Sequence, residues 1–452
     1  MYKPLVFEIP QGKNDILVKI KEKNIVTSTS INEPKISLGF HYFFHRTKDS
    51  MSITNDLKKK NKFYYVVNPF EHIISDYSED INTMTRKFFR MKEKDPNILS
   101  RAFYKMWEML VSFELIEKDN LTYAALAEAP GSFIQAVIEY REKFSKTMKK
   151  DKVFSVTIKP EDGNYIEMSK QFLGHYNKKY SRMIKVHKTY SLKKLKEEKY
   201  KGNDNGDITK LNTISNFKKD VLKSKKYADL VTADGGFKWD NENYQEQEAY
   251  QLILGEMIGA LSIQAKGGHF VLKIFESFTD VTLKLIYLLS SFYENCYIYK
   301  PFISRESNSE KYIVCKNFLM EPGSKKIMDK IATLEKLLED MGTKEYTNDI
   351  FPSLKLPSEF VSKIKYINIQ VMNRQQVIIN KIITYIKNNN YYGEAFHKYR
   401  KAQIEANKWW LDTYYHAPED YNKNRKKLIE NVNKRASYNN SEIKNFSKVL
   451  VI

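Results

Sequence analysis

The stretch LTYAALAEAPGSF, residues 121–133, decides the fold that we predict for this chain. Residues 121–127 form a short, mainly apolar run of the kind found in buried strands, and the pattern of a helix begins at Gly131. Small residues fill the turn between the two, so a ligand can approach the backbone there and reach the free N–H groups at the start of the helix. Taken alone, the stretch is equally consistent with an ordinary strand-to-helix turn.

Strands and helices alternate after this turn. Further strands are predicted at residues 153–158, 228–233, 270–274, 297–299 and 312–314, and further helices near 214–222, 245–265 and 281–293. Strands that alternate with helices indicate a doubly wound α/β sheet. The last two strands are close enough in sequence to form an antiparallel edge.

The chain divides into three regions by pattern. Residues 1–95 mix short β-like runs, at 16–20 and 63–67, with polar loops, which indicates a small α/β or β-rich extension. Residues 96–320 hold the alternating pattern. Residues 321–452 contain amphipathic stretches and predict a helical region without strands, whose Lys- and Asn-rich end is expected to be partly mobile.

The composition favours a nucleic-acid partner. The chain has 452 residues, 42% of them hydrophobic, and a formal charge of +20 from 75 Lys and Arg against 55 Asp and Glu. Such a charge favours a polyanion, although an excess of lysine also arises from genomic bias. No apolar run approaches the roughly 18 residues that cross a bilayer, so we expect a soluble intracellular protein without a membrane partner.

Cysteine and histidine indicate no metal site. Cys296 and Cys315 form no Cys-x-x-Cys clip, and both are predicted to be buried thiols. His41 and His45 have the spacing that places two rings on one face of a helix, but no third ligand follows them in the chain. We therefore predict no metal.

Four ionisable residues stand where an α/β sheet places its chemistry. Asp234 and Lys273 each close an apolar strand, and Glu310 precedes another. Lys105 lies on a predicted helix. Because open α/β sheets bind their ligands at the ends of strands, we expect these four residues to form one site. The alternative for each lysine is an ordinary surface position, although a charge that ends an apolar strand needs a reason.

The chemistry that two lysines and two acids offer is proton transfer. A neutral lysine can accept the proton of a ribose hydroxyl and so make its oxygen a better nucleophile. A second amine and burial both lower the pKa of a lysine, whereas neighbouring carboxylates raise it. The sequence therefore leaves the net pKa of Lys273 open.

The segment DNGDIT, residues 204–209, predicts a turn with a projecting carboxylate, Asp207. Such a group can bind a ribose hydroxyl or the adenine amino group of a cofactor, although similar turns are common on protein surfaces. No acid directly ends the strand at 153–158, where many nucleotide-binding folds hold the ribose. Asp207 is therefore one candidate for that role, and Glu161 and Asp162 are the others.

Together these motifs resemble the RrmJ/FtsJ-type RNA 2′-O-methyltransferases, which use S-adenosylmethionine (SAM), in particular the adrift-type, cap-specific branch found in eukaryotes and large DNA viruses. The likeness covers about residues 97–318. It rests on the order and spacing of SRAFYK (100–105), EAPGSF (128–133), GDIT (206–209), ADGGF (233–237), GGHFVLK (267–273) and the run SRESNSEKY (304–312). The resemblance implies a Rossmann-like class I methyltransferase sheet with an antiparallel edge strand.

The resemblance also implies residue roles. Lys105, Asp234, Lys273 and Glu310 match the catalytic tetrad of the family, with Lys273 as the proton acceptor and Asp234 as its close partner. The positions that contact SAM correspond to Ala127, Glu128, Ala129, Pro130, Gly131, Ser132, Phe133, Asp207 and Ile208. The positions that contact RNA correspond to Asn243 and Asn308, whose amides suit sugar and phosphate. The sequence departs from the family at Ala129 and Ser132, where many members carry glycine, so we expect weaker cofactor binding.

These implications predict an enzyme that methylates the 2′-oxygen of a nucleotide near the 5′ end of capped mRNA. Basic tracts at 58–60, 149–150 and 223–226, with abundant tyrosines, are expected to attract single-stranded RNA around the site. The alternatives are a ribosomal RNA 2′-O-methyltransferase and a non-catalytic RNA-binding subunit of an mRNA-processing complex. Other capping or transcription proteins are further candidate partners. The nucleus and the cytoplasm, including a viral factory or a virion, both remain as expected locations.

Overall fold

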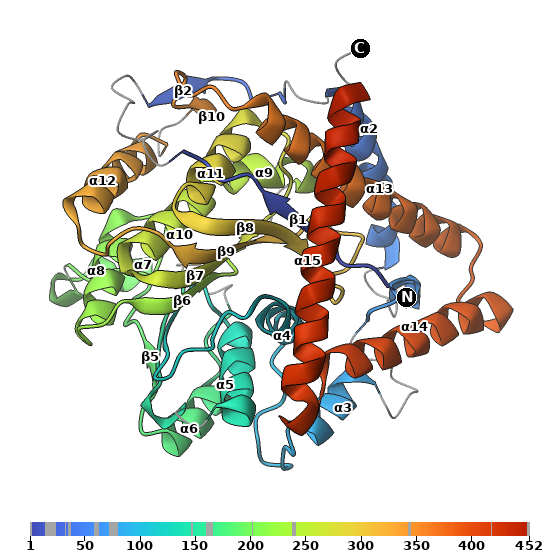
Figure 1. Ribbon diagram of the computed structural model, residues 1–452, viewed down its shortest axis with the longest axis horizontal. Coiled ribbons are helices and arrows are strands. Elements are labelled where there is room, and N and C mark those ends of the chain that lie inside the picture. Colours follow the sequence, from blue (N-terminus) through green and yellow to red (C-terminus); the bar gives the residue numbers. More distant parts are fainter. Residues whose placement is uncertain are drawn as a thin grey trace.

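A computed structural model describes residues 2–13, 24–31, 33–34, 38–57, 63–71, 80–145, 148–159, 166–200, 202–236, 241–341, 345–416 and 418–449. Its centre is an eight-stranded mixed sheet with helices on both faces (Figure 1). The strands follow one another across the sheet in the order β1 (Leu5–Ile9), β8 (Tyr293–Lys300), β9 (Lys311–Phe318), β7 (Gln264–Ile274), β6 (Ala228–Ala233), β3 (Thr122–Leu126), β4 (Lys152–Val156) and β5 (Ile184–Val186).

The sheet is parallel from β7 to β5 and antiparallel at its other end. The α/β sheet predicted from the alternating pattern is therefore confirmed, as is the antiparallel pairing of β8 with β9. However, β8 and β9 are not the edge of the sheet. That position belongs to β1, from the region of residues 1–95, which pairs with β8 in antiparallel register.

The order of the strands reverses at β3. The chain runs from β3 outward through β4 to β5 and then returns to place β6 on the other side of β3. This topology predicts a crevice between the carboxyl ends of β3 and β6, because the connecting helices on the two sides of such a reversal lie on opposite faces of the sheet. This is where open α/β sheets bind their ligands.

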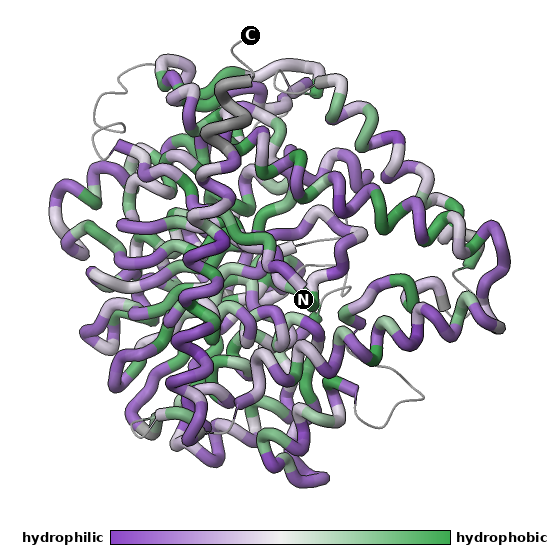
Figure 2. Tube along the Cα trace, turned by 45° about the vertical axis from the view of Figure 1, so that its right-hand side comes forward, coloured by the Kyte–Doolittle hydropathy of each residue, from purple (hydrophilic) through white to green (hydrophobic). Residues whose placement is uncertain are grey.

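Helices cover both faces of the sheet because the parallel strands are apolar on both sides. One face packs against helices that include α8 (Leu211–Leu222), α10 (Tyr250–Ile263) and α11 (Asp280–Ser290). The other packs against α4 (Ala102–Phe113), α5 (Ser132–Phe144) and α6 (Lys170–Lys179). In Figure 2 the hydrophobic stretches concentrate around the sheet, whereas the outlying helices alternate between hydrophobic and hydrophilic residues.

The two terminal regions pack onto this central body. The remaining elements are β2 (Ile25–Ser28), α2 (Leu38–Asp49), α3 (Ile81–Phe88), α7 (Leu192–Leu195), α9 (Gln245–Glu248), α12 (Lys325–Asp340), β10 (Tyr346–Ile350), α13 (Ser358–Lys387), α14 (Gly393–Tyr414) and α15 (Pro418–Val449), with 3₁₀ turns at Ser50–Leu57, Phe63–Val67, Met148–Lys150, Glu198–Tyr200 and Glu242–Tyr244. Among the described residues, no helix is long and apolar enough to span a membrane.

Two predictions about the terminal regions were wrong. Residues 63–67 form a 3₁₀ turn rather than a strand, and its apolar side chains pack against α13. A strand does occur beyond residue 320, since β10 pairs with β2. The Lys- and Asn-rich end is part of the long helix α15, which packs along β1 and α4 (Figure 1). The β-like run at 16–20 lies outside the described residues.

Candidate active site

Neighbouring strands bring the predicted residues to one edge of the sheet. Leu126 of β3 pairs with Ala233 of β6, and Ala233 pairs with Leu272 of β7, so the three strands end close to the same level. Asp234 directly follows β6, and Lys273 is the next-to-last residue of β7. These side chains therefore stand beside the crevice where the strand order reverses.

Lys273 and Asp234 form a close pair. Nζ of Lys273 lies 3.1 Å from Oδ1 of Asp234 and donates a 2.8 Å hydrogen bond to the Asp234 backbone carbonyl. Tyr312 of β9 is paired with Lys273 across the sheet, and its hydroxyl donates to Oδ1 of Asp234 at 3.0 Å. The carboxylate is thus held by donors from two adjacent strands, which fixes it beside the amine.

Lys105 and Glu310 form a second pair. Nζ of Lys105, on α4, lies 2.7 Å from Oε1 of Glu310, which precedes β9. Ser304 donates its hydroxyl to the same oxygen at 2.8 Å, and Nζ of Lys300 donates to the Glu310 backbone carbonyl at 2.8 Å. The side chains of both pairs keep only 11–18% of their surface exposed, so they are largely desolvated yet open to a ligand.

The two pairs influence one another through charge. Burial raises the pKa of Glu310, but the ammonium groups of Lys105 and Lys273 outweigh burial and lower this pKa to about 2. Burial lowers the pKa of Lys273, but the charges of Asp234 and Glu310 outweigh it and raise this pKa above its ordinary value. The structure thus brings Lys105, Asp234, Lys273 and Glu310 together, and it holds Lys273 as an ammonium.

The turn after β3 ends in the helix α5, as predicted. Glu128 is buried, and its Oε1 accepts a 2.9 Å hydrogen bond from the backbone N–H of Phe133. Its other oxygen, Oε2, is buried and has no hydrogen-bond partner among the described residues. Burial and the charge of Asp234 raise the pKa of Glu128 to about 8. A cationic group of a ligand would satisfy this carboxylate.

The side chain of Ser132 is bonded within the protein. Its hydroxyl hydrogen-bonds to that of Ser100 at 2.8 Å. The hydroxyl is therefore satisfied within the protein. Gly131, in contrast, has a φ of 111°, which favours glycine.

The segment that holds Asp207 and Ile208 lies beside the end of β4. The backbone carbonyl of Asn205 accepts a 2.6 Å hydrogen bond from Lys159, and a Cβ on Gly206 would lie 2.1 Å from the carbonyl oxygen of Thr157. Asp207 bonds to the backbone N–H and the hydroxyl of Thr209, at 3.0 and 2.7 Å. Its carboxylate therefore closes the turn, while the side chain of Ile208 is buried in the core. Glu161 and Asp162 lie outside the described residues.

Comparison with known proteins identifies the central part of the chain. Residues 98–318 match the family described as FtsJ-like methyltransferase. This range contains both lysine–carboxylate pairs and the turn after β3. The chain contains an FtsJ-like methyltransferase domain.

Named relatives match the same domain. The cap-specific mRNA (nucleoside-2′-O-)-methyltransferase 1 of Mus musculus is 35% identical over 206 residues, which cover 44% of this chain and 21% of that protein. The corresponding methyltransferase 2 of Drosophila melanogaster is 26% identical over 323 residues, or 70% of this chain and 42% of that protein. The chain thus spans about a fifth of the length of the mouse relative.

A solved structure described as a ribosomal RNA methyltransferase of Plasmodium falciparum also matches. It is 20% identical, with a TM-score of 0.35, and the match covers 49% of this chain and 98% of that one.

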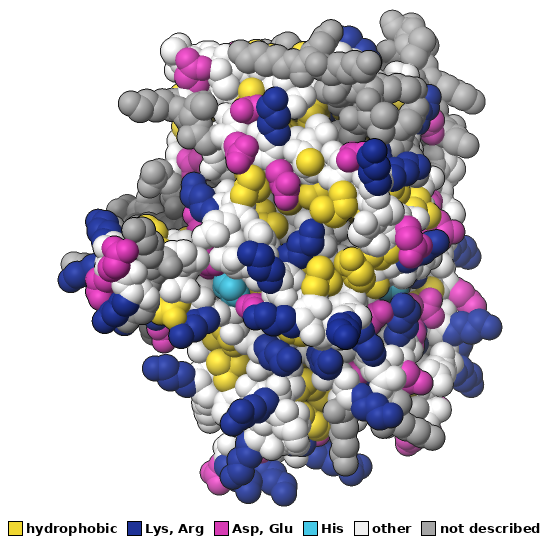
Figure 3. Space-filling model, turned by 90° about the vertical axis from the view of Figure 1, so that its left-hand side faces the viewer, with side chains coloured by type: hydrophobic (Ala, Val, Ile, Leu, Met, Phe, Trp, Pro, Cys, Tyr) yellow, Lys and Arg dark blue, Asp and Glu magenta, His cyan; other side chains and the backbone are white. Residues whose placement is uncertain are grey.

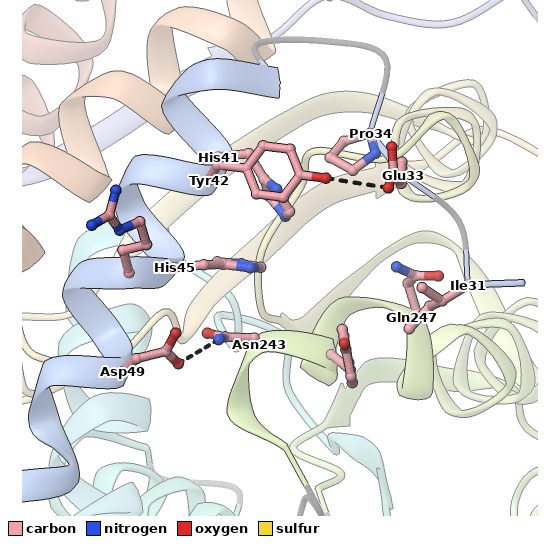
Figure 4. A pocket seen from close by; sticks show the side chains of 11 residues that line it. Ile31, Glu33, Pro34, His41, Tyr42, His45, Asp49, Asn243 and Gln247 are labelled. Carbon is pink, nitrogen blue, oxygen red and sulfur yellow. Dashed lines mark hydrogen bonds between the residues drawn. The ribbon is translucent and has the colours of Figure 1, made fainter.

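The two asparagines predicted to face RNA lie in different settings. Asn243 lines a pocket of about 260 Å³ beside α2, and its amide nitrogen donates to Oδ1 of Asp49 at 2.6 Å (Figure 4). Asn308 bonds inward instead, because its amide oxygen accepts from Nζ of Lys300 at 2.9 Å and from the hydroxyl of Ser304 at 3.3 Å. Asn308 therefore braces the loop that carries Glu310.

The two predicted basic tracts that the structure describes do not lie around the site. The tract at 223–226 lies between α8 and β6, and the tract at 149–150 precedes β4, so both stand at the amino ends of parallel strands. The candidate site lies at the opposite edge. Figure 3 shows Lys and Arg side chains spread across one face of the molecule. The tract at 58–60 lies outside the described residues.

Sequence reasoning missed several residues that hold the methyltransferase site together. Tyr312, Ser304 and Lys300 each bond to a member of the two pairs. Glu256, buried on α10, accepts a 3.0 Å hydrogen bond from the backbone N–H of Gly235, beside Asp234. Lys300 carried a usable signal, since it is a charged residue that ends an apolar strand, as Lys273 does. Nothing in the sequence pattern distinguishes the other three.

Proposed function

We propose that this chain transfers the methyl group of SAM to the 2′-oxygen of a nucleotide near the 5′ end of capped mRNA. The observation that carries this proposal is the convergence of two lysine–carboxylate pairs at the crevice between β3 and β6. The match of this region to the FtsJ-like methyltransferases and the names of the relatives support the choice of donor and substrate.

SAM fits the groups that the crevice offers. The cofactor carries positive charge, and the crevice holds a buried carboxylate, Glu128, with one oxygen that lacks a partner among the described residues. We assign cofactor binding to residues 127–133 and to the segment of Asp207 and Ile208, which lies beside the neighbouring strand end. When bound, SAM supplies a methyl group activated by a sulfonium sulfur. Ala129 and Ser132, the two positions at which we expect a weaker fit to the cofactor, lie within this assigned segment.

The protein's part in the reaction is to position the ribose and to take up a proton. Lys273 accepts the proton of the 2′-hydroxyl at Nζ, which leaves an electron pair on the oxygen for the new bond to carbon. Asp234 holds this amine in place through its carboxylate and its backbone carbonyl. Lys105 and Glu310 offer a donor and an acceptor for the ribose, held rigidly by their mutual bond and by Ser304.

RNA approaches the carboxyl edge of the sheet in this proposal. Asn243 and the exposed Arg46 line the pocket beside α2 and offer contacts to sugar and phosphate. Asn308 acts indirectly, through the loop that carries Glu310. Because the substrate is capped mRNA, the protein is expected to act where transcripts are capped, in the nucleus or in the cytoplasm of a cell infected by a virus that transcribes there.

Mapping of the methyl group tests the proposal. The purified full chain is incubated with isotopically labelled SAM and with a capped RNA, the same RNA without its cap, and a ribosomal RNA fragment. We expect label on the 2′-oxygen of the first or second transcribed nucleotide of the capped RNA. Label in the ribosomal fragment alone would assign a different substrate, and binding of SAM without transfer to any RNA would contradict the enzymatic function.

A further inference from the structure

Two histidines of α2 and an acid that follows strand β7 lie close together beside the candidate active site. His41 and His45 are one helical turn apart, and Figure 4 shows both rings pointing from α2 toward the same pocket. Glu276 lies two residues beyond the end of β7. One donor atom from each of the three side chains lies within 4.8 Å of the other two. The sequence suggested the two histidines, and the fold supplies a third group from far along the chain.

One nitrogen of this cluster has no hydrogen-bond partner among the described residues and is available to a ligand. Nε2 of His45 lies 2.8 Å from Oε2 of Glu276. Nδ1 of His41 is buried and has no hydrogen-bond partner among the described residues. A buried imidazole nitrogen without a partner is unfavourable, so an occupant that accepts its electron pair would stabilise the cluster.

We propose that His41, His45 and Glu276 bind a divalent transition metal ion, and that zinc is the ion they suit best. Two imidazole nitrogens and one carboxylate oxygen are a common ligand set for zinc, with a water molecule in the fourth position. Ligand atoms of a tetrahedral site with bonds of about 2.0 Å are roughly 3.3 Å apart. The pair of His45 and Glu276 therefore has to open by a few tenths of an ångström, and the wider separations within the cluster, of up to 4.8 Å, have to close.

The surroundings of Glu276 fit the role of a ligand. Its Oε1 accepts hydrogen bonds from Nζ of Lys48 at 2.6 Å and from the hydroxyl of Ser309 at 3.1 Å, which leaves Oε2 directed at His45. Such bonds to the second oxygen orient a ligating carboxylate. The positive charge of Lys48 disfavours a cation nearby. However, Nζ of Lys48 also donates to the backbone carbonyl of Glu242 at 2.6 Å, which holds it beside Oε1 of Glu276 rather than Oε2.

The adjacent pocket provides access and additional negative charge. His41 and His45 line this pocket of about 260 Å³ together with Glu33 and Asp49, so an ion can reach the cluster from solvent. Both acids lower the cost of a bound cation.

A metal here would join two parts of the chain. Two ligands come from α2, in the region of residues 1–95, and the third from the sheet that carries Lys273. Glu276 also contacts Ser309, the neighbour of Glu310. The ion would therefore fasten α2 to the edge of the sheet beside the candidate active site. This role does not depend on the proposed methyl transfer.

Metal binding by the full-length chain, prepared without a histidine tag, tests this inference. We expect about one equivalent of zinc per chain by elemental analysis. After removal of zinc, Co²⁺ should bind with visible d–d absorption, and zinc should raise the Tm. His41→Ala is the main variant, because His41 is only partly buried, and His45→Ala is the second. Each should weaken Co²⁺ binding by at least roughly tenfold.

The matched control is His397→Ala, since His397 is exposed on α14 and distant in sequence from the cluster. It should bind Co²⁺ as the unmodified chain does. Absence of zinc together with no response of the Tm to added zinc would overturn the inference. Equal Co²⁺ affinity in the unmodified chain and in folded His41→Ala, checked by circular dichroism, would also overturn it.

Discussion

At the scale of single residues, the proposed reaction depends on the charge of Lys273. Burial disfavours its ammonium form, but Asp234 and Glu310 more than compensate and raise the pKa of Lys273. Only the small fraction of molecules in which this amine has lost its proton can accept one from a hydroxyl. A bound cation such as the SAM sulfonium lowers this pKa, because like charges disfavour the ammonium.

The rate of methyl transfer should therefore depend on pH. We predict a rise of roughly tenfold per pH unit until the rate levels off at the pKa of Lys273 in the substrate complex. Asp234→Asn removes the largest charge that raises this pKa, so its slower reaction should level off at a lower pH. Single-turnover rates between about pH 6 and pH 11 check both statements. A flat profile of the unmodified chain, or an unchanged plateau in the variant, would contradict this role of Lys273.

Glu128 gives a separate prediction for cofactor binding. Its pKa of about 8, against an ordinary 4.5, means that the empty protein loses stability as the pH rises between these values, since only the unfolded chain then ionises. A cationic cofactor favours the ionised carboxylate. Its affinity should therefore rise with pH up to about 8 and then level off.

Calorimetric titration of SAM into the full chain checks this prediction. Glu128→Gln is the matched variant, because it keeps the size of the side chain and cannot ionise. This variant should bind SAM more weakly. Its affinity for SAM should no longer change with pH, apart from any change caused by the titration of SAM itself. The prediction fails if both proteins show the same pH dependence.

The sequence indicated which residues end strands but not how they are held. Asp234 and Lys273 could be predicted because a charge that closes an apolar strand stands at the binding edge of the sheet. The roles of Tyr312 and Ser304 depend on the register of β9 and on a loop conformation, neither of which has a pattern in the sequence. The pKa of Lys273 depends on three-dimensional distances for the same reason.

At the scale of elements, Glu108 joins the segments that carry Lys105 and Glu310. It lies on α4, one turn after Lys105, and is completely buried. Its carboxylate accepts hydrogen bonds from the backbone N–H groups of Phe302 and Ile303, at 2.8 and 3.0 Å, and from Nε1 of Trp410 at 2.8 Å. These bonds therefore fix the helix of Lys105, the loop that leads to Glu310 and the helix α14 to one another.

Trp410→Phe should loosen this junction. The substitution removes one donor from a buried carboxylate. It should lower the free energy of unfolding by about 1–3 kcal/mol. Chemical denaturation of the full chain measures this change. Trp409→Phe is the control, because the described side-chain contacts of Trp409 are ring packing against Tyr2, Phe70, Phe302 and Tyr414. Equal stability of Trp410→Phe and the unmodified chain would show that the bond is dispensable.

The elements that the sequence missed have partners far away in the chain. The central strands were predictable because each is a short apolar run between helices. The pairing of β10 with β2 joins residues more than three hundred positions apart, as Tyr346 with Ser28 illustrates. The apolar run Phe63–Val67 was misassigned because short apolar runs do not distinguish a strand from a helical turn packed on a neighbouring helix.

At the scale of the whole molecule, the terminal regions complete the central sheet. The N-terminal strand β1 extends it, and α15 lies along β1, where Asn439 donates to the backbone carbonyl of Val6 at 2.7 Å. Asn440 reaches Glu8 at 3.0 Å. The sequence separated these regions from the centre because neither continues its regular alternation of strands and helices.

If the proposed RNA binding occurs, its salt dependence locates the contacts on the surface of the molecule. Affinity for RNA should fall as salt rises, with a slope of about 0.7 in the logarithmic plot for each phosphate contacted. Arg46→Ala, beside Asn243, should reduce the slope by about that amount. Combined replacement of Lys223, Lys225 and Lys226 by serine should leave it nearly unchanged, since this tract lies at the far edge of the sheet. The reverse result would place RNA on that far edge.

Replacement of Lys273 is the most direct test of the account. In Lys273→Ala, methyl transfer to capped RNA should be lost while SAM still binds, because the amine takes up the proton and Glu128 and its turn hold the cofactor. Lys401→Ala, an exposed lysine of α14, should behave as the unmodified chain. Transfer and SAM binding are measured on the same preparations. Loss of transfer with SAM binding retained is the predicted result, and turnover of Lys273→Ala at the rate of the unmodified chain would contradict the account.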